Sequence, residues 1–279
     1  MSADFLQQMA ESSRERVRIA RRSVSDAALL DLAQATPLAP ALQRHREGFD
    51  LIAEMKLRSP AAGQLKSGDE DVPARVTAYA QGGAAAVSIL TEPSRFDGSL
   101  AHLQAGARTL APLRVPAMRK DFLVDPYQVL EARIAGAGGV LVILRMLPRP
   151  HIEALLEQAR TLGLFVLLEA FDEQDLEQMH DLVATDRGGV VLAGVNCRDL
   201  VTLQVVPHRL EQLARLLPAT VPRVAESGVG SAEDARRVSA AGYDLALVGS
   251  ALMQGGDPRA LAAAMLAAGR AAHATRGAR

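Results

Sequence analysis

The sequence predicts an α/β fold, a (β/α)8 TIM barrel with an N-terminal helical extension. The prediction rests on the spacing of apolar runs and on the helical segments between them. Eight short apolar runs begin 24 to 35 residues apart, at 49–56, 84–90, 115–120, 139–144, 164–169, 191–196, 221–226 and 245–249. Segments with helical periodicity lie between these runs. Nearly continuous apolar runs are typical of parallel strands buried on both faces. Eight strand–helix units favour closure into one barrel, with an open doubly wound sheet as the alternative.

Capping residues mark where the intervening helices begin and end. The periodicity predicts helices at 73–81, 127–135, 149–162 and 232–241. Asp125-Pro126 opens the second of these and Ser231 opens the last, while Gly82, Gly136, Gly163 and Gly242 follow helix ends. Since no linker is visible, we expect a helical extension at 1–48 that caps the barrel, a catalytic barrel at 49–269 and a flexible tail at 270–279.

The first 48 residues differ from the rest of the chain. Leu6, Met9 and Val17 recur at helical spacing, and five arginines fall between Arg14 and Arg22. This pattern predicts one or two amphipathic helices. A basic stretch can bind an anionic surface, but we favour a solvated helix face whose arginines pair with acids.

Composition narrows the classes of function. The chain has a net charge of -1, 3% aromatic residues and no Trp, which argues against a nucleic-acid-binding surface. Cys197 is the one cysteine, so there is neither a disulfide framework nor a cysteine-built zinc site, and we interpret it as a packing residue. The six histidines form no metal-spaced pair and no nucleotide motif occurs, so we expect no metal and no cofactor.

Without a signal peptide or a membrane-length apolar run, we expect a cytoplasmic protein that does not engage a membrane.

Polar and charged side chains gather at the carboxyl ends of the predicted strands, where barrels of this kind carry their active sites. They are Glu54, Lys56, Thr91, Glu92, Arg119, Lys120, Asp121, Arg145, Glu169, Asn196 and Glu226. Glu54 and Lys56 are two residues apart and therefore point to the same side of their strand. Burying charges is costly unless they are paired or functional, so the pattern favours a catalytic site over salt bridges at the barrel mouth.

Small residues follow the last two predicted strands, as Ser227-Gly228 and Gly249-Ser250. At this place in a barrel, backbone N–H groups and a helix N-terminus can hold a phosphate, and glycine lets the backbone approach the anion. Each dipeptide alone is also typical of a tight turn. Together they favour a phosphorylated small-molecule substrate.

These strand-end residues lie in ordered blocks that resemble indole-3-glycerol phosphate synthases from about residue 49 to 258. The blocks are Ile52-Ala53-Glu54-Met55-Lys56 with Ser59-Pro60, Gly82 to Glu92 with Phe96-Asp97-Gly98-Ser99, Arg119-Lys120-Asp121-Phe122 with Asp125-Pro126-Tyr127-Gln128, Leu168-Glu169, Gly194-Val195-Asn196, Arg198-Asp199-Leu200, Glu226-Ser227-Gly228 and Val248-Gly249-Ser250. The resemblance implies a carboxy-lyase of tryptophan biosynthesis. It would close the ring of 1-(2-carboxyphenylamino)-1-deoxyribulose 5-phosphate with loss of CO₂ and water.

The resemblance also implies a role for each matched residue. Lys120 would be the general acid of ring closure, with a pKa tuned by its neighbours so that it can donate, and Glu169 would act in the later proton removal and dehydration. Lys56 would hold the substrate carboxylate or phosphate, Glu54 and Asn196 would orient the lysines and a substrate hydroxyl, and Glu226 would bind the sugar-like chain. The phosphate would lie among Ser59, Ser227, Gly228, Gly249 and Ser250, and the apolar wall would be Phe96 and Phe122.

Four positions depart from the family pattern: Ala61, Phe171, Cys197 and Val206. Loss of one phosphate hydrogen bond would cost about 1–3 kcal/mol and weaken binding without abolishing the chemistry. The departures leave open a specialised paralogue in a secondary pathway and a pseudoenzyme that binds the ligand without turnover. Phosphoribosylanthranilate isomerase is less favoured because it lacks the block around Lys120. The sequence leaves a monomer and a homodimer open.

Overall fold

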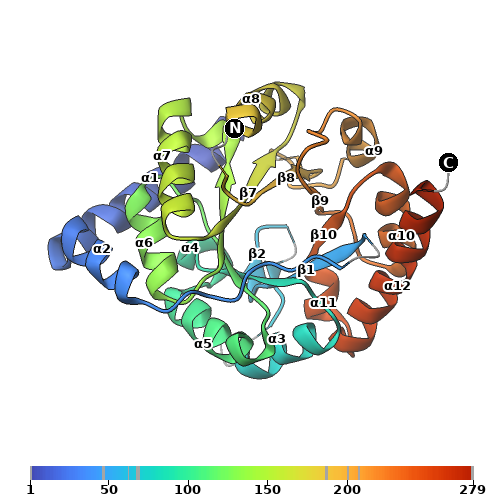
Figure 1. Ribbon diagram of the computed structural model, residues 1–279, viewed down its shortest axis with the longest axis horizontal. Coiled ribbons are helices and arrows are strands. Elements are labelled where there is room, and N and C mark those ends of the chain that lie inside the picture. Colours follow the sequence, from blue (N-terminus) through green and yellow to red (C-terminus); the bar gives the residue numbers. More distant parts are fainter. Residues whose placement is uncertain are drawn as a thin grey trace.

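Eight parallel strands close into a barrel in the computed structural model, which describes residues 2–45, 48–61, 63–66, 70–185, 188–199, 201–206 and 208–277. The strands are β1 (Asp50–Met55), β4 (Ala86–Leu90), β5 (Ala117–Lys120), β6 (Gly139–Ile143), β7 (Phe165–Ala170), β8 (Val191–Asn196), β9 (Arg223–Glu226) and β10 (Leu245–Val248). Figure 1 looks into this ring of strands, with helices around it. Since β1 pairs with β10, with Asp50 opposite Leu245, the predicted barrel is confirmed and the open sheet is wrong.

The helices that follow the strands form the outer layer. The longer ones are α3 (Val72–Gln81), α5 (Leu100–Leu110), α6 (Pro126–Ile134), α7 (Arg149–Thr161), α8 (Glu173–Thr185), α10 (Ala232–Ala241) and α12 (Pro258–Gly277), and the shorter ones are α4 (Pro93–Phe96), α9 (Arg209–Ala214) and α11 (Ser250–Gln254). The side chains of Asp125 and Ser231 cap α6 and α10 as their positions predict. All four helices predicted from periodicity are confirmed to within one residue at each end.

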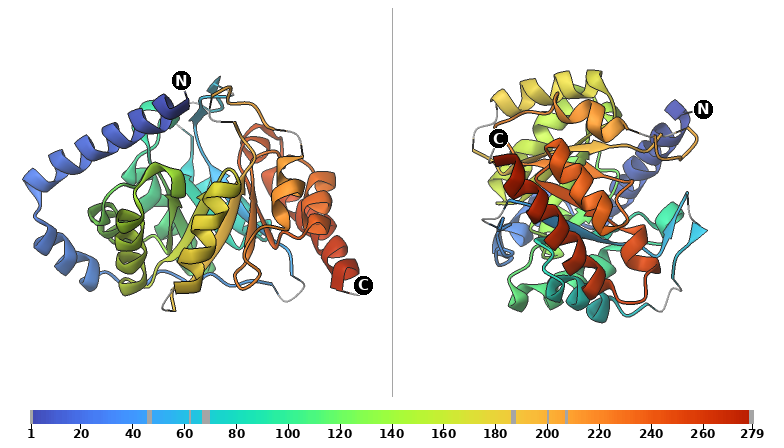
Figure 2. Two further views of the ribbon diagram at one scale, coloured as in Figure 1. Left: turned by 90° about the horizontal axis from the view of Figure 1, so that it is seen from above. Right: turned by 90° about the vertical axis from the view of Figure 1, so that its right-hand side faces the viewer.

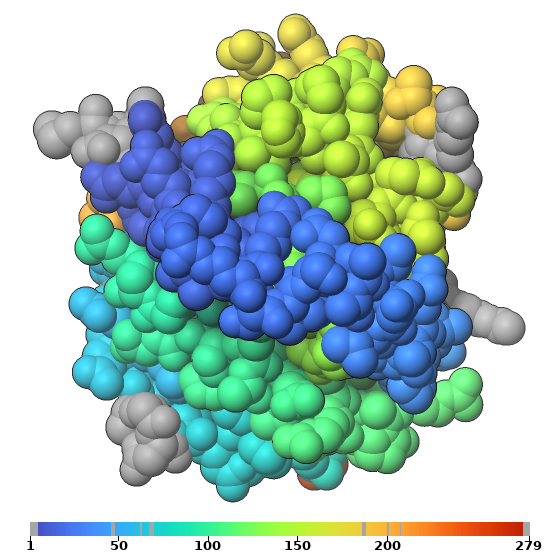
Figure 3. Space-filling view, turned by 90° about the vertical axis from the view of Figure 1, so that its left-hand side faces the viewer, coloured from blue at the N-terminus to red at the C-terminus, as the bar shows by residue number. Residues whose placement is uncertain are grey.

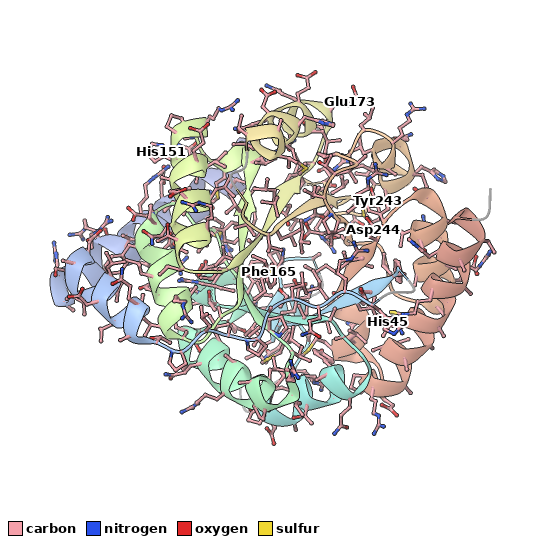
Figure 4. The ribbon with its side chains drawn as sticks, in the orientation of Figure 1. His45, His151, Phe165, Glu173, Tyr243 and Asp244 are labelled. Atoms are coloured by element: carbon pink, nitrogen blue, oxygen red, sulfur yellow. The ribbon has the colours of Figure 1, made fainter. Side chains whose placement is uncertain are left out.

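Apolar side chains form one cluster inside the barrel and another between the strands and the helices. Phe165 belongs to the inner cluster and lies near the centre of the ring (Figure 4), while His151 on α7 and Glu173 on α8 lie on the outer layer. A Cβ on Gly139 would stand 2.4 Å from the Phe165 ring, so glycine makes room for this ring on the neighbouring strand. The barrel interior is therefore packed, and the cavity described below lies at the carboxyl ends of the strands.

The N-terminal extension consists of α1 (Ser2–Ser23) and α2 (Asp26–Ala35), which confirms the predicted helices, followed by residues 36–45 without helix. Figure 2 shows α1 crossing one end of the barrel while the chain after α2 returns along the other end to β1. From the side the extension forms a continuous band over the outer helices (Figure 3). Its arginines pair with acids as expected, for example Arg21 with Asp26 and Asp125, but Arg16 is largely buried and does not belong to a solvated face.

Two further features lie outside the repeating pattern. A two-stranded antiparallel hairpin, β2 (Arg58–Ser59) with β3 (Gly63–Gln64), follows β1 and was not predicted. The segment expected as a tail is helical as far as Gly277, because α12 continues through it, and residues 278 and 279 lie outside the described part. Within the described ranges, no helix combines the length and apolar character needed to cross a membrane.

Candidate active site

One cavity opens at the carboxyl ends of the strands, with a volume of about 1030 Å³ that includes space open to solvent. All thirteen residues predicted for the site line it, namely Glu54, Lys56, Ser59, Phe96, Lys120, Phe122, Glu169, Asn196, Glu226, Ser227, Gly228, Gly249 and Ser250. They come from strands on every side of the ring or from the turns that follow them. The topology thus brings together residues that are up to 196 positions apart in the chain, from Glu54 to Ser250.

Lys120 lies between two carboxylates at the floor of this cavity. Its Nζ is 3.2 Å from Glu169 Oε2 and 3.4 Å from Glu226 Oε2, and both glutamates are almost fully buried. Burial alone would lower the pKa of Lys120, but Glu169, Glu226 and Glu54 outweigh it and raise that pKa. The neighbouring carboxylates therefore favour the protonated form of the amine, and the tuning of this pKa for proton donation stays a prediction.

The two carboxylates differ from each other in their surroundings. Burial and the neighbouring charge of Glu169 raise the pKa of Glu226 well above its ordinary value. Glu226 Oε1 is buried and makes no hydrogen bond to any residue that the structure describes, which leaves an acceptor or a protonated oxygen inside the site. A buried polar atom of this kind is usually satisfied by a partner that the site is shaped to receive.

Glu54 and Lys56 form a second ion pair beside the first, with Lys56 Nζ 2.5 Å from Glu54 Oε1. They project into the cavity from one side of the chain at β1, as their two-residue spacing predicts. Burial would raise the pKa of Glu54, but Lys56 and Lys120 more than offset it and lower that pKa. The carboxylate of Glu54 is therefore ionised and electrostatically coupled to both lysines.

The backbone after β9 and β10 forms the far end of the cavity. Ser227 and Gly228 both adopt positive φ, 65° and 69°, a conformation that is costly for any residue with a Cβ. Gly249 precedes α11 and Ser250 is its first residue, while the nearly buried Ser59 comes from the hairpin. This turn and the start of α11 lie where barrels of this kind hold a phosphate on backbone N–H groups.

Aromatic rings form another part of the cavity wall. The ring centroids of Phe96 and Phe122 are 6.1 Å apart, and Phe5 of α1 meets Phe122 edge-on at 5.9 Å. Phe5 and Leu6 both line the cavity, and so does Arg198. Sequence reasoning missed these three, although the apolar spacing in α1 that includes Leu6 was a signal that this face would be buried.

The positions that depart from the family pattern lie at or near the cavity. Ala61 and Phe171 line it, and the Arg145 guanidinium lies 4.8 Å from the centre of the Phe171 ring. Cys197 is buried, and burial raises the pKa of its thiol to about 11, as for a packing residue. Val206 does not line the cavity but lies with Cys197 in a smaller one. Leu200, from a matched block, lies outside the described residues.

Asn196 is turned toward the loop that follows its own strand. Its Oδ1 accepts a hydrogen bond of 3.0 Å from the backbone N–H of Arg198. Asn196 therefore fixes the start of this loop while it lines the cavity. Across the described residues, no group of three or more His, Cys, Asp or Glu is placed to hold a metal ion.

Comparison with known proteins adds sequence relatives that cover most of the chain. The family model for indole-3-glycerol phosphate synthase matches residues 6–265. A protein of that name from Mycolicibacterium smegmatis is 39% identical over 272 residues, or 96% of each chain. Another from Parafrankia sp. is 44% identical over 219 residues, or 78% of each chain.

Solved structures support the fold. Thiamine phosphate pyrophosphorylase from Pyrococcus furiosus aligns with a TM-score of 0.60 at 17% identity, over 81% of this chain and 98% of that one. The 3-hexulose-6-phosphate synthase of Salmonella typhimurium aligns with the same score at 12% identity, over 81% of this chain and 99% of that one. At such low identity these likenesses concern the barrel architecture alone.

Proposed function

Because the chain belongs to the indole-3-glycerol phosphate synthase family, we propose that it converts 1-(2-carboxyphenylamino)-1-deoxyribulose 5-phosphate into indole-3-glycerol phosphate, as a carboxy-lyase of tryptophan biosynthesis. The observation that carries this proposal is the position of Lys120. Its ammonium lies on the cavity floor between Glu169 and Glu226. A proton donor thus lines the same cavity as a turn suited to anions and two aromatic rings, and these groups match the reacting centre, the phosphate and the ring of such a substrate.

The two ends of the cavity suit the two ends of the substrate. The turn at Ser227-Gly228 and the start of α11 at Gly249-Ser250 offer backbone N–H groups to the phosphate, with Ser59 beside them. At the other end, Phe96 and Phe122 pack against the aromatic ring of the substrate. Binding both ends holds the chain between them against Lys120, and such positioning lowers the barrier to ring closure.

Ring closure joins the carboxylate-bearing ring carbon to the ketone carbon of the substrate. As this bond forms, the ketone oxygen takes a proton from Lys120 Nζ, and the bond to the carboxylate then breaks to release CO₂. The surrounding carboxylates keep Lys120 protonated before the substrate enters, which is the form that a general acid needs. The nearby Lys56 ammonium would hold the substrate carboxylate until it departs.

Dehydration completes the indole ring. The adjacent carbon loses a proton to Glu169, while the new hydroxyl takes a proton from Lys120, which has been reprotonated from solvent, and leaves as water. Glu226 hydrogen-bonds a hydroxyl of the sugar-like chain, because none of the described side chains or backbone groups already bonds to its buried Oε1. Glu54 and Asn196 act through their neighbours, because Glu54 orients Lys56 and Asn196 orients the loop at Arg198.

A steady-state assay tests the proposal directly. Purified protein and authentic substrate should yield an indole product, which fluoresces strongly where the protein itself has no Trp and three Tyr. Without product formation the chain would be a ligand-binding pseudoenzyme, provided that calorimetry still detects binding of the substrate. If the protein neither converts the substrate nor binds it, both the enzyme and the pseudoenzyme hypotheses are refuted.

A further inference from the structure

Helix α1 is joined to the barrel through buried polar contacts as well as apolar ones. Ser13 Oγ donates to the carbonyl of Phe122 at 2.5 Å and accepts from Gln128 Nε2 at 2.8 Å. Both guanidinium Nη atoms of Arg16 donate to the carboxylate of Asp121, at 2.9 Å and 2.7 Å. A bidentate pair of this kind fixes direction as well as distance.

Asp121 is the centre of this network and its side chain is fully buried. It also accepts hydrogen bonds from Thr91 Oγ1 at 2.6 Å, from Arg119 Nη2 at 3.0 Å and from the backbone N–H of Phe122 at 2.8 Å. Burial would raise the pKa of Asp121, but Arg16 and Arg119 outweigh it and hold that pKa well below its usual range. One carboxylate therefore ties α1 to the ends of β4 and β5.

The place of Asp121 in the chain connects this network to the cavity. Lys120 precedes it and points to the floor, whereas Arg119 faces the opposite side of β5 and donates to the carbonyl of Gln128 on α6. Phe122 follows it and packs between Phe5 and Phe96. The same carboxylate thus stands between the proton donor and the aromatic wall.

We propose that Arg16 is a positioning residue for the reaction, acting through Asp121 to align the Lys120 ammonium and the Phe122 ring with the substrate. The proposal rests on the proposed function. Arg16 touches neither substrate nor reacting atoms. By holding the carboxylate of Asp121, Arg16 couples the position of α1 over the cavity to the orientation of Lys120 and Phe122.

A purely structural anchor would behave differently, and the chain offers a matched control. Arg21 also joins α1 to the barrel, through a bidentate contact with Asp125 at 2.7 and 2.8 Å, but it does not reach Asp121. Arg21→Met therefore removes an anchor of the same kind from the same helix. Both variants should lower the melting temperature, so stability alone does not distinguish the two roles.

The experiment compares kcat, KM and inhibition by inorganic phosphate for Arg16→Met, Arg21→Met and the wild type, at a temperature where all three are folded. Misplacing a catalytic group by about 1 Å can cost about 100-fold, so we expect kcat of Arg16→Met to fall at least about tenfold. KM should rise, because Phe5 and Phe122 lose their alignment. The inhibition constant of phosphate should stay within about twofold, because neither arginine lines the cavity that contains Ser227 and Ser250. Arg21→Met should keep kcat near the wild-type value.

Two further measurements keep the outcome decisive. Arg16→Lys retains a cation without the bidentate fork, so its kcat should lie between those of the wild type and Arg16→Met. Amide hydrogen exchange at Phe122, whose N–H is held by Asp121, should quicken in Arg16→Met but not in Arg21→Met. Equal kcat in the two methionine variants, or unchanged exchange at Phe122, would overturn the proposal. Absence of product from the wild type refutes the proposed function instead, and the exchange comparison still tests the link from Arg16 to Phe122.

Discussion

Gly249 leaves room for the carboxylate of Glu54, because a Cβ at Gly249 would lie 2.3 Å from Glu54 Oε1 and 2.8 Å from Lys56 Nζ. Real Cβ atoms do not approach other atoms this closely, so any side chain here displaces the ion pair. The glycine therefore has a steric role in the site in addition to exposing backbone N–H groups.

Gly249→Ala should accordingly damage the site without unfolding the protein. We expect kcat/KM to fall by about 10²-fold, as for other displacements of about 1 Å. Steady-state kinetics measure the loss, and circular dichroism verifies the fold. Gly256→Ala is the matched control, since nothing lies within 4 Å of a Cβ built there. Equal activity in the two variants would show that the space beside Glu54 is not needed.

Lys120→Met should lose almost all turnover while phosphate still binds. Methionine fills a similar volume but has no proton to donate, and it leaves Glu169 and Glu226 facing each other without a cation. Removing a general acid typically costs about 10²–10⁴-fold in rate. Single-turnover kinetics measure the chemistry, and calorimetry with inorganic phosphate measures binding at Ser227 and Ser250. A kcat near the wild-type value would refute the assignment of Lys120 as the acid.

Glu226→Gln should change how the free energy of unfolding depends on pH. The pKa of Glu226 is raised in the folded state, so the stability contributed by its protonated form is complete below its ordinary pKa of 4.5. That stability is lost as the pH rises through the folded-state pKa, at about 1.4 kcal/mol for each unit of difference between the two states. Glutamine does not ionise and avoids this loss.

Urea unfolding at a series of pH values tests this expectation. The stability of Glu226→Gln relative to the wild type should increase from pH 4.5 upward. Parallel curves for the two proteins would mean that Glu226 ionises in the folded state as easily as in the unfolded chain.

Ser250→Glu should raise KM more than it lowers kcat. Ser250 begins α11 at the end of the cavity opposite the aromatic wall, and a carboxylate there repels a bound phosphate. Interactions made equally in the ground state and the transition state appear in KM. Ser250→Ala, which adds no charge, should have the smaller effect on KM. If Ser250→Glu leaves KM unchanged, the phosphate binds elsewhere.

The strands and the gathering of charges at their ends could be predicted because each depends on local pattern plus one topological rule. A strand buried on both faces is almost entirely apolar, so the apolar run at 191–196 predicts a strand from local sequence alone. Once the barrel closes, Lys120 and Glu169 must meet at the same end. Their separation of 3.2 Å, and the resulting rise in the pKa of Lys120, depend on packing that no local pattern contains.

The contacts of α1 could not be predicted in the same way. Arg16 is one of five arginines within nine residues, and nothing in the sequence separates it from Arg14 or Arg18. Its partner Asp121 lies 105 positions later. The hairpin of β2 and β3 was missed because its strands are two residues long and contain no apolar run. Arg119 did carry a signal, since alternation along β5 places it opposite Lys120.

The separation of 105 positions between Arg16 and Asp121 also affects the order of events during synthesis. Helix α1 leaves the ribosome before the barrel strands do, and its polar partners after β5 and on α6 are made about a hundred residues later. Contacts so distant in sequence must await the closing of a long loop, which slows their formation. A helix translated before the barrel is therefore one of the later elements to dock, and until then its apolar face stays exposed on the nascent chain.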